Sequence, residues 1–261
     1  LLNRHSIFNM LAVFHSWVSG GPEELRSPTS RKGKWKSGAE MMDSFVDERR
    51  EAVCLKVADA GAMSLSHRNQ NLLQPRCLAC VDDIFCIFVG FLDNLADLRR
   101  QYGLCMNAKE DMLVIEAYRA LRDRSPYPPD QVLKDLNGTF AFVLYDASKS
   151  TIFAAADKEG KVALYWGSAS DGSLVFSDDP NVLQDGCDKS FAPFPPGCMF
   201  WNAGGLQSFE HPLHKMQAVA RVDSEGQMCG ATFRVDKFSR INSIPRVGSA
   251  CNWANLYSFS S

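Results

Sequence analysis

Few residues in the sequence have the types and spacings that could support chemistry. Cys77 and Cys80 form the sequence CLAC, whose CxxC spacing could supply half of a zinc site or a redox pair. A second CxxC or a nearby Cys/His pair is missing from the sequence, although Cys86 and Cys105 could complete a set of four sulfur ligands. Because Cys86 stands inside the apolar run IFCIF, we expect it to be buried in a strand. We therefore interpret these cysteines as packing residues and predict neither a bound metal nor a cofactor.

Two acidic pairs and one basic run are the other charged candidates. Asp82 with Asp83, and Asp178 with Asp179, could bind a hard cation through carboxylate oxygens. Neither pair stands in a loop of defined ligand spacing, so we expect turn residues. The run RKGKWK, residues 31–36, could be a nuclear signal or contact phosphate, but a solvated loop is the expected outcome.

The composition indicates an ordinary soluble globular protein. The 261 residues are 46% hydrophobic and 22% charged, a balance that can bury a core without metals or disulfides. The formal net charge of -2 gives no general attraction to nucleic acid or anionic lipid, so we expect no nucleic-acid partner. No apolar run approaches the roughly 18–20 residues of a membrane helix, so we expect no membrane insertion.

Cysteine usage indicates the compartment. The nine cysteines are an odd count without the regular spacing of a disulfide framework, and several stand inside apolar runs. This pattern predicts a reducing compartment, the cytoplasm, with the nucleus as the alternative. Residues 1–9, LLNRHSIFN, lack the apolar region of a signal peptide. We expect these residues to be a disordered leader, with Met10 as a candidate start.

Hydrophobic patterning places the first elements. A buried strand is expected within NMLAVFHSW, residues 9–17, followed by a Gly/Pro/Ser/Lys-rich surface loop over residues 19–38. Residues 41–67 predict a short helix and one or two strands. The apolar run after Cys80 predicts a strand with layers on both faces, which Gly90 ends before a turn.

The second half predicts a helical pair and then many strands. Apolar residues at intervals of three, with acidic residues first and arginines last, predict a helix over residues 109–124. A second short helix is expected from Pro129 to about Leu136. Strands, with one short helix at residues 180–186, are expected in the segments 139–146, 150–157, 161–168, 173–179, 194–201, 205–211 and 226–236. This order indicates an α+β domain of two sheets with helices outside them, over residues 10–238, and a polar tail over residues 239–261.

Several segments resemble the glutaminase domain of asparagine synthetases. The sequence LNGTFAFVLYD, residues 136–146, resembles the LDGxFAF strand entry of that domain. Residues 155–167, 176–186 and 191–201 resemble its later segments in the same order.

Two short motifs make the resemblance closer. The motif YGL comprises Tyr102, Gly103 and Leu104, and the motif LRDR comprises Leu121, Arg122, Asp123 and Arg124. Together with the ordered segments, they resemble the plant aluminium-induced proteins with YGL and LRDR motifs, a group that includes stem-specific and stress- and auxin-responsive members. The resemblance implies a four-layer αββα sandwich of the N-terminal-nucleophile hydrolase, or class-II glutamine amidotransferase, type. The charged residues of LRDR could form helix-end ion pairs, dock the following SPYPP loop or contact a partner.

The resemblance also implies where a catalytic site would lie. In these glutaminases the initiator methionine is removed and the next residue, a cysteine, attacks the glutamine amide while its α-amine serves as base. In this sequence Leu11 follows Met10, and a leucine side chain can neither attack nor transfer a proton. His15 stands close in sequence to that position and is a candidate for the lining of the old pocket, with a hydrogen-bonded structural role as the alternative.

The other catalytic positions differ as well. The oxyanion turn reads NGE in the glutaminases, whereas this sequence has Val89, Gly90 and Phe91, without the side-chain donor. The aspartate that holds glutamine would fall near Lys109 or Glu110. We therefore predict no catalytic residues, and a catalytically degenerate protein with a stress- or hormone-responsive binding or scaffold role. A homodimer and protein partners of unknown identity suit this role. The alternatives are a glutamine-hydrolysing enzyme and an amino-acid sensor that uses the old pocket.

Overall fold

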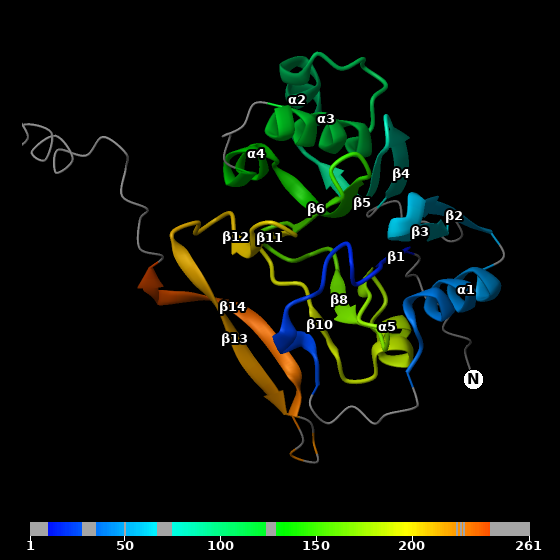
Figure 1. Cartoon of the computed structure of the whole chain (residues 1–261). Helices are drawn as coiled ribbons and strands as arrows, with labels where there is room; N and C mark the ends of the chain where they lie inside the picture. The colour runs from blue at the N-terminus through cyan, green and yellow to red at the C-terminus, as the bar shows by residue number, and fades with distance from the viewer. Residues whose placement is uncertain are drawn as a thin grey trace, which may run out of the picture.

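The computed structural model (Figure 1) describes residues 10–27, 35–49, 51–66, 75–123, 129–222, 224, 226 and 228–240. The expected leader, most of the basic run, His67 and Arg124 lie outside these residues. Among the described helices, none is long and apolar enough to cross a membrane.

The first sheet is six-stranded and has β1 near its centre. Its order is β10-β8-β9-β1-β3-β2, and the paired strands are antiparallel. The strands are β1 (Met10–Phe14), β2 (Ala52–Val57), β3 (Gly61–Ser66), β8 (Tyr165–Ser168), β9 (Leu174–Ser177) and β10 (Phe191–Pro193). The N-terminal strand therefore lies between segments that are far apart in the sequence.

The second sheet is also six-stranded, in the order β12-β11-β7-β6-β5-β4. Its strands are β4 (Arg76–Val81), β5 (Ile84–Leu92), β6 (Gly138–Asp146), β7 (Thr151–Ala156), β11 (Cys198–Trp201) and β12 (Gly205–Ser208). The long β5–β6 pair lies inside this sheet, between β7 and the edge strand β4, with Val89 opposite Ala141.

Helices cover the outer face of each sheet. Helices α1 (Gly38–Glu48) and α5 (Pro180–Cys187) pack on the first sheet, while α3 (Glu110–Asp123) packs on the second beside α2 (Leu95–Tyr102) and α4 (Pro129–Asp135). Figure 1 shows the two groups of helices on opposite sides of the molecule, with a long hairpin of β13 (His214–Val222) and β14 (Met228–Arg240) at one side. Two short 3-10 helices lie at Glu23–Leu25 and Ala58–Ala60.

Strand alternation produces three apolar layers. Met10, Ala12 and Phe14 of β1 contribute to the core between the sheets, whereas Leu11 and Val13 pack toward α1 and α5. Aromatic rings fill the central layer, where Phe14 lies 5.5 Å from Tyr145 between ring centroids. Each sheet thus buries apolar side chains on both faces, which confirms the four-layer αββα sandwich.

Some sequence-based expectations were wrong in detail. Gly90 does not end its strand, because β5 continues to Leu92. At Gly90 the φ angle is +110°, and a Cβ atom would lie 2.0 Å from the carbonyl oxygen of Thr139, so only glycine fits. The patterning also missed α2, β4, β10 and β13.

Candidate functional site

The head of β1 is where a nucleophile would stand, and the segment before α5 covers it. The Met10 amide donates a hydrogen bond to Asp178 Oδ1 at 2.9 Å. The Met10 carbonyl accepts one from Ser177 Oγ at 2.8 Å. Both backbone polar groups of this residue are therefore engaged by neighbouring residues of one loop.

A buried ion pair between the two sheets also lies at the head of β1 and excludes solvent from it. Arg76 Nε donates to Asp178 Oδ2 at 3.1 Å, and both side chains are nearly inaccessible to solvent. Arg76 is the register partner of Val89 across the β4–β5 pair, so its side chain lies on the inner face of the sheet. The pair therefore joins the head of β1 to the oxyanion-turn position. Sequence reasoning missed Arg76, although an arginine at the start of an apolar strand was a signal.

Asp178 and Asp179 form the two-residue connection between β9 and α5, in line with the turn that we expected, but both are buried. Asp179 Oδ1 accepts a hydrogen bond from the Asn181 amide at 2.9 Å and caps the N-terminus of α5. Its other oxygen lies 3.5 Å from Arg49. The acidic pair is thus structural, and it anchors α5 and β1. Asp82 and Asp83 form the tight turn between β4 and β5, with positive φ angles at both residues.

Leu11 is fully buried and has a packing environment. Its side chain belongs to the apolar cluster formed with Met41, Phe45 and Leu183 on the helix side of the first sheet. The residue at the nucleophile position therefore points away from the space between the sheets, which Met10 occupies.

The residues at the oxyanion-turn position, Val89, Gly90 and Phe91, also have structural roles. Val89 is buried in the core between the sheets, and Phe91 is 38% exposed on the surface. The Gly90 amide donates to the Pro75 carbonyl at 2.8 Å. A donor that could hold an oxyanion is thus used within the backbone.

The remaining pocket candidates do not join these residues. Lys109 is exposed at the start of α3 beside Glu110, and the next residue, Asp111, is buried and accepts from the Met112 amide. His15 lies beyond the other end of β1, where its amide donates to the Ala60 carbonyl at 2.8 Å. Because four residues of strand separate His15 from Leu11, about 13 Å of backbone lies between them.

The surroundings of Cys77 and Cys86 disfavour the thiolate form. Burial raises the pKa of Cys77 and of Cys86 well above the usual value, and the nearby Asp111 carboxylate raises both further. Cys77 and Cys80 stand three residues apart in β4, so their side chains point to opposite faces of the sheet. Within the described part of the chain no group of three or more Cys, His, Asp or Glu residues could hold a metal ion, and the eight described cysteines form no disulfide.

The YGL motif ends α2. Gly103 has a φ angle of +67°, in the left-handed region, and its amide together with that of Leu104 caps the last carbonyls of the helix. Tyr102 and Leu104 pack against the helix side of the second sheet.

The LRDR motif ties α3 to the second sheet. Arg122 donates to Asp123 at 2.8 Å and to the fully buried Asp146 at 3.2 Å, at the end of β6. The Tyr118 hydroxyl also donates to Asp146 at 3.0 Å, and Leu121 packs beneath the helix. These contacts agree with the expectation of helix-end ion pairs.

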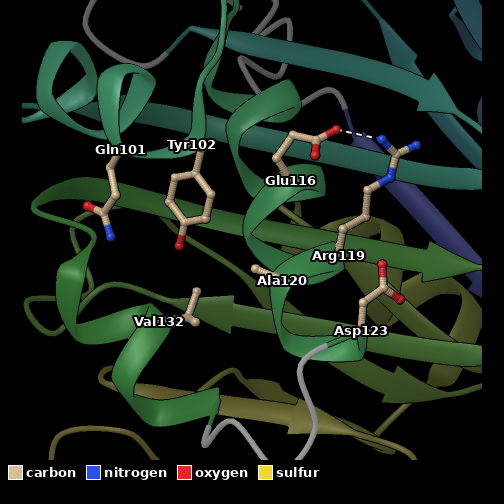
Figure 2. Close-up of a pocket in the computed structure, with 7 residues that line it drawn as sticks. All are labelled: Gln101, Tyr102, Glu116, Arg119, Ala120, Asp123 and Val132. Carbon is tan, nitrogen blue, oxygen red and sulfur yellow. Dashed lines mark hydrogen bonds and ion pairs between the residues drawn. The ribbon is translucent and has the colours of Figure 1, made fainter.

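The two motifs meet at one surface hollow. Figure 2 shows Tyr102 at the end of α2 facing α3, with Val132 of α4 below it and Asp123 at the far end of α3. The hollow measures about 370 Å³, and Arg119 at its edge binds Glu116 at 2.6 Å. Its charged side chains are on the outer face of α3, each already paired with a neighbour.

Known proteins of two kinds are similar to this chain in sequence. The family model described as "Aluminium induced protein" matches residues 11–235. The stem-specific protein TSJT1 of Nicotiana tabacum is 46% identical over 148 residues, 56% of this chain and 99% of that protein. A probable glutamine-hydrolysing asparagine synthetase of Dictyostelium discoideum is 44% identical over 71 residues, which cover 27% of this chain and only 13% of that protein.

A similar solved structure is the glutamine aminotransferase class-II domain protein of Silicibacter pomeroyi, with a TM-score of 0.40 and 12% identity over 76% of this chain and 96% of that chain. The family match covers most of the described sandwich, including both motifs. The chain belongs to the aluminium-induced protein family.

Proposed function

We propose that this protein is a catalytically degenerate relative of the glutamine amidotransferases, with a binding or scaffold role. The buried Leu11 at the head of β1 carries the proposal, because amide hydrolysis in this fold needs a nucleophile there. Leucine has no lone pair to attack with and no proton to transfer.

The surroundings of Leu11 support the same conclusion. Hydrolysis would also need space for glutamine and donors for the oxyanion. The ion pair of Arg76 and Asp178 closes this region, where the relative exposure of the two residues is 5% and 2%. The Gly90 amide is committed to Pro75. Cys77 and Cys86 do not replace the missing nucleophile, because they are protonated thiols on the helix side of the second sheet.

The binding role follows from the family and from the surface. The aluminium-induced proteins include stress- and auxin-responsive members. This chain has the sandwich fold but lacks the residues for glutamine hydrolysis. Exposed apolar side chains, at Trp17, Met106 and Phe238 among the described residues, offer contacts to a protein partner or to a second copy of the chain. Unbridged cysteines suit the cytoplasm or nucleus, and the net charge of -2 favours a protein over a nucleic acid as partner.

The decisive experiment measures ammonia release from millimolar glutamine. The protein beginning at Met10 is compared with its Leu11→Cys variant and with the full chain. We expect no release above background from either unmodified form. Activity gained by Leu11→Cys would show that the pocket can still open, in which case loss of the nucleophile alone explains the inactivity. Turnover by the unmodified protein would overturn the proposal in favour of a glutamine-hydrolysing enzyme.

The sensor alternative has its own measurement. An amino acid that binds the folded state raises the unfolding temperature, by an amount that grows with its concentration. We expect no shift with glutamine, asparagine or glutamate, because Arg76 and Asp178 close the site. A saturable shift abolished by Val89→Trp would instead place the ligand in the old pocket.

A further inference from the structure

A second hollow lies at the edge of the first sheet, beside the C-terminal end of β1. It measures about 730 Å³, within the range of roughly 300–1,000 Å³ that is typical of small-molecule sites. Its walls are α1 on one side and the β2–β3 pair on the other, which lie side by side in Figure 1. None of the aluminium-induced family motifs contributes to it.

The hollow exists because α1 covers the sheet unevenly. Met41 and Phe45 of α1 are buried against β1 and α5. The neighbouring helical face, Met42 and Val46, lines the hollow. On the sheet side, the small Ala62 stands between larger neighbours in the register row Val13–Ala62–Lys56.

The floor of the hollow is apolar. Val13 and Met42 are nearly inaccessible to solvent, with relative exposures of 2% and 6%, and Val46 and Ala62 are partly buried beside them. An apolar body placed over this floor would remove from water the parts of Val46 and Ala62 that are still exposed, which is favourable roughly in proportion to the area covered.

The rim of the hollow is acidic. Asp43 and Asp47 stand one turn apart on α1, and Asp59 faces them from the end of β2. In the described part of the chain none of these three carboxylates forms an ion pair. Lys56 is the cationic side chain of the lining, so two negative charges remain in excess while His15 is neutral. The charge of this rim is therefore complementary to a cation.

We propose that this hollow binds an organic cation with an apolar body, an arylalkylamine or alkylamine. The ammonium group lies at the rim with Asp43 and Asp47, and the apolar body covers Val13 and Met42. An anion would meet the excess of carboxylates. A bare metal ion would lack a set of ligands, because no group of three metal-binding side chains is present in the described residues.

The lining of the hollow also includes one thiol, that of Cys54. Partial burial raises the pKa of Cys54, and Asp43 raises it further against the opposing effect of Lys56. The raised pKa favours the uncharged thiol near neutral pH, so Cys54 adds no negative charge to the rim.

The test titrates the full chain with 2-phenylethylamine and follows backbone amide resonances by NMR. We expect saturable shifts confined to α1, β2, β3 and the end of β1, with a dissociation constant of about 10 mM or tighter. The neutral 2-phenylethanol should bind at least about fivefold more weakly, since it lacks the charge that the rim attracts. Raising the salt concentration should weaken only the amine. Absence of saturation, equal binding of the alcohol or shifts elsewhere would each overturn the proposal.

Matched variants separate charge from shape. The double variant Asp43→Asn/Asp47→Asn should weaken amine binding about fivefold, whereas Lys56→Met should strengthen it about twofold. Glu48→Gln is the control, because Glu48 is an exposed acid of the same helix outside the lining and is paired with Arg49. It should change affinity less than about twofold. An unchanged affinity in the double variant, with circular dichroism confirming its fold, would overturn the proposal.

Discussion

Arg76 of the second sheet and Asp178 of the first form an ion pair of 3.1 Å that is closed to solvent and joins the two sheets at the head of β1. The same carboxylate accepts the Met10 amide. Charges in such a place are tolerated when each has a partner, and removal of one partner leaves the other buried without compensation. The pair therefore lies, as a structural feature, where the resemblance to the glutaminases would place a nucleophile.

The first prediction concerns this pair. Asp178→Asn should lower the free energy of unfolding by about 3–5 kcal/mol, because the buried Arg76 guanidinium loses the charge of Asp178. Urea unfolding followed by circular dichroism measures the loss. Asp97→Asn is the matched control, since the Asp97–Arg100 pair is exposed and its loss should cost less than about 1 kcal/mol.

A double-mutant cycle with Arg76→Met sharpens the result. If the two side chains stabilise one another, the double variant should be less destabilised than the sum of the single variants. Additive losses, or an Asp178→Asn loss as small as that of the control, would contradict the coupling between the sheets.

The second prediction concerns acid. Burial alone would raise the pKa of the Asp146 carboxyl, but hydrogen bonds from Ser148, Tyr118 and Arg122 outweigh it and hold the pKa below its usual value. A carboxyl with a lowered pKa in the folded state stabilises the protein above its unfolded pKa of about 3.9, and this contribution is lost as the pH falls through the folded value. Asp146→Asn should therefore destabilise the protein most near neutral pH.

The measurement is the difference in unfolding free energy between the native protein and Asp146→Asn at several pH values. This difference should begin to narrow near pH 4, where the carboxyl becomes protonated in the unfolded chain. It should be lost as the pH falls through the lowered pKa of the folded state. A difference that stays constant down to about pH 2 would mean that Asp146 stabilises α3 through shape alone.

The third prediction compares three glycines. Gly103→Ala should cost about 1–2 kcal/mol, because alanine is strained at a φ angle of +67° although no atom crowds the site. Gly90→Ala should prevent soluble expression or cost more than about 4 kcal/mol, since its Cβ atom would lie 2.0 Å from a carbonyl oxygen. Gly20→Ala is the control, because it has neither a positive φ angle nor a neighbour within 4 Å. Equal stability of the Gly103 and Gly20 variants would contradict the assignment of the YGL glycine as a helix cap.

The layers could be predicted from the sequence because apolar residues fill both faces of the strands. The run IFCIFVGFL supplies the central core and the helix-side core from alternate positions, which is a local property of the chain. Helix α2 was missed because LADLRRQY has only two leucines on its buried side. Strand β13 was missed because only one of its faces packs on the sandwich, so its exposed residues follow no strict pattern.

Some features of the candidate site could likewise be predicted from the sequence, and others could not. Leu11 and Val89 could be placed because each stands beside a recognisable segment. The partnership of Arg76 and Asp178 could not, because 102 residues separate them and only the packing of two sheets brings them together. The hollow at α1 has the same origin, since its acidic rim comes from a helix and a strand end that meet only in the fold.

The last prediction concerns the CLAC cysteines. Cys77 and Cys80 occupy alternate faces of β4, Cys77 against α3 and Cys80 on the other face near Asp82 and Asp83. A single zinc ion cannot bind both thiols without disrupting the strand, because tetrahedral coordination needs the sulfurs on one side. Equimolar zinc should therefore leave the iodoacetamide labelling of Cys80, read by mass spectrometry, unchanged.

The same labelling should be faster at Cys105 than at Cys80. Burial and the carboxylates of Asp83 and Asp82 raise the pKa of Cys80, and this slows its reaction. Joint protection of Cys77 and Cys80 by zinc would require β4 to open, and would replace the packing interpretation with a metal-dependent change at the sheet edge.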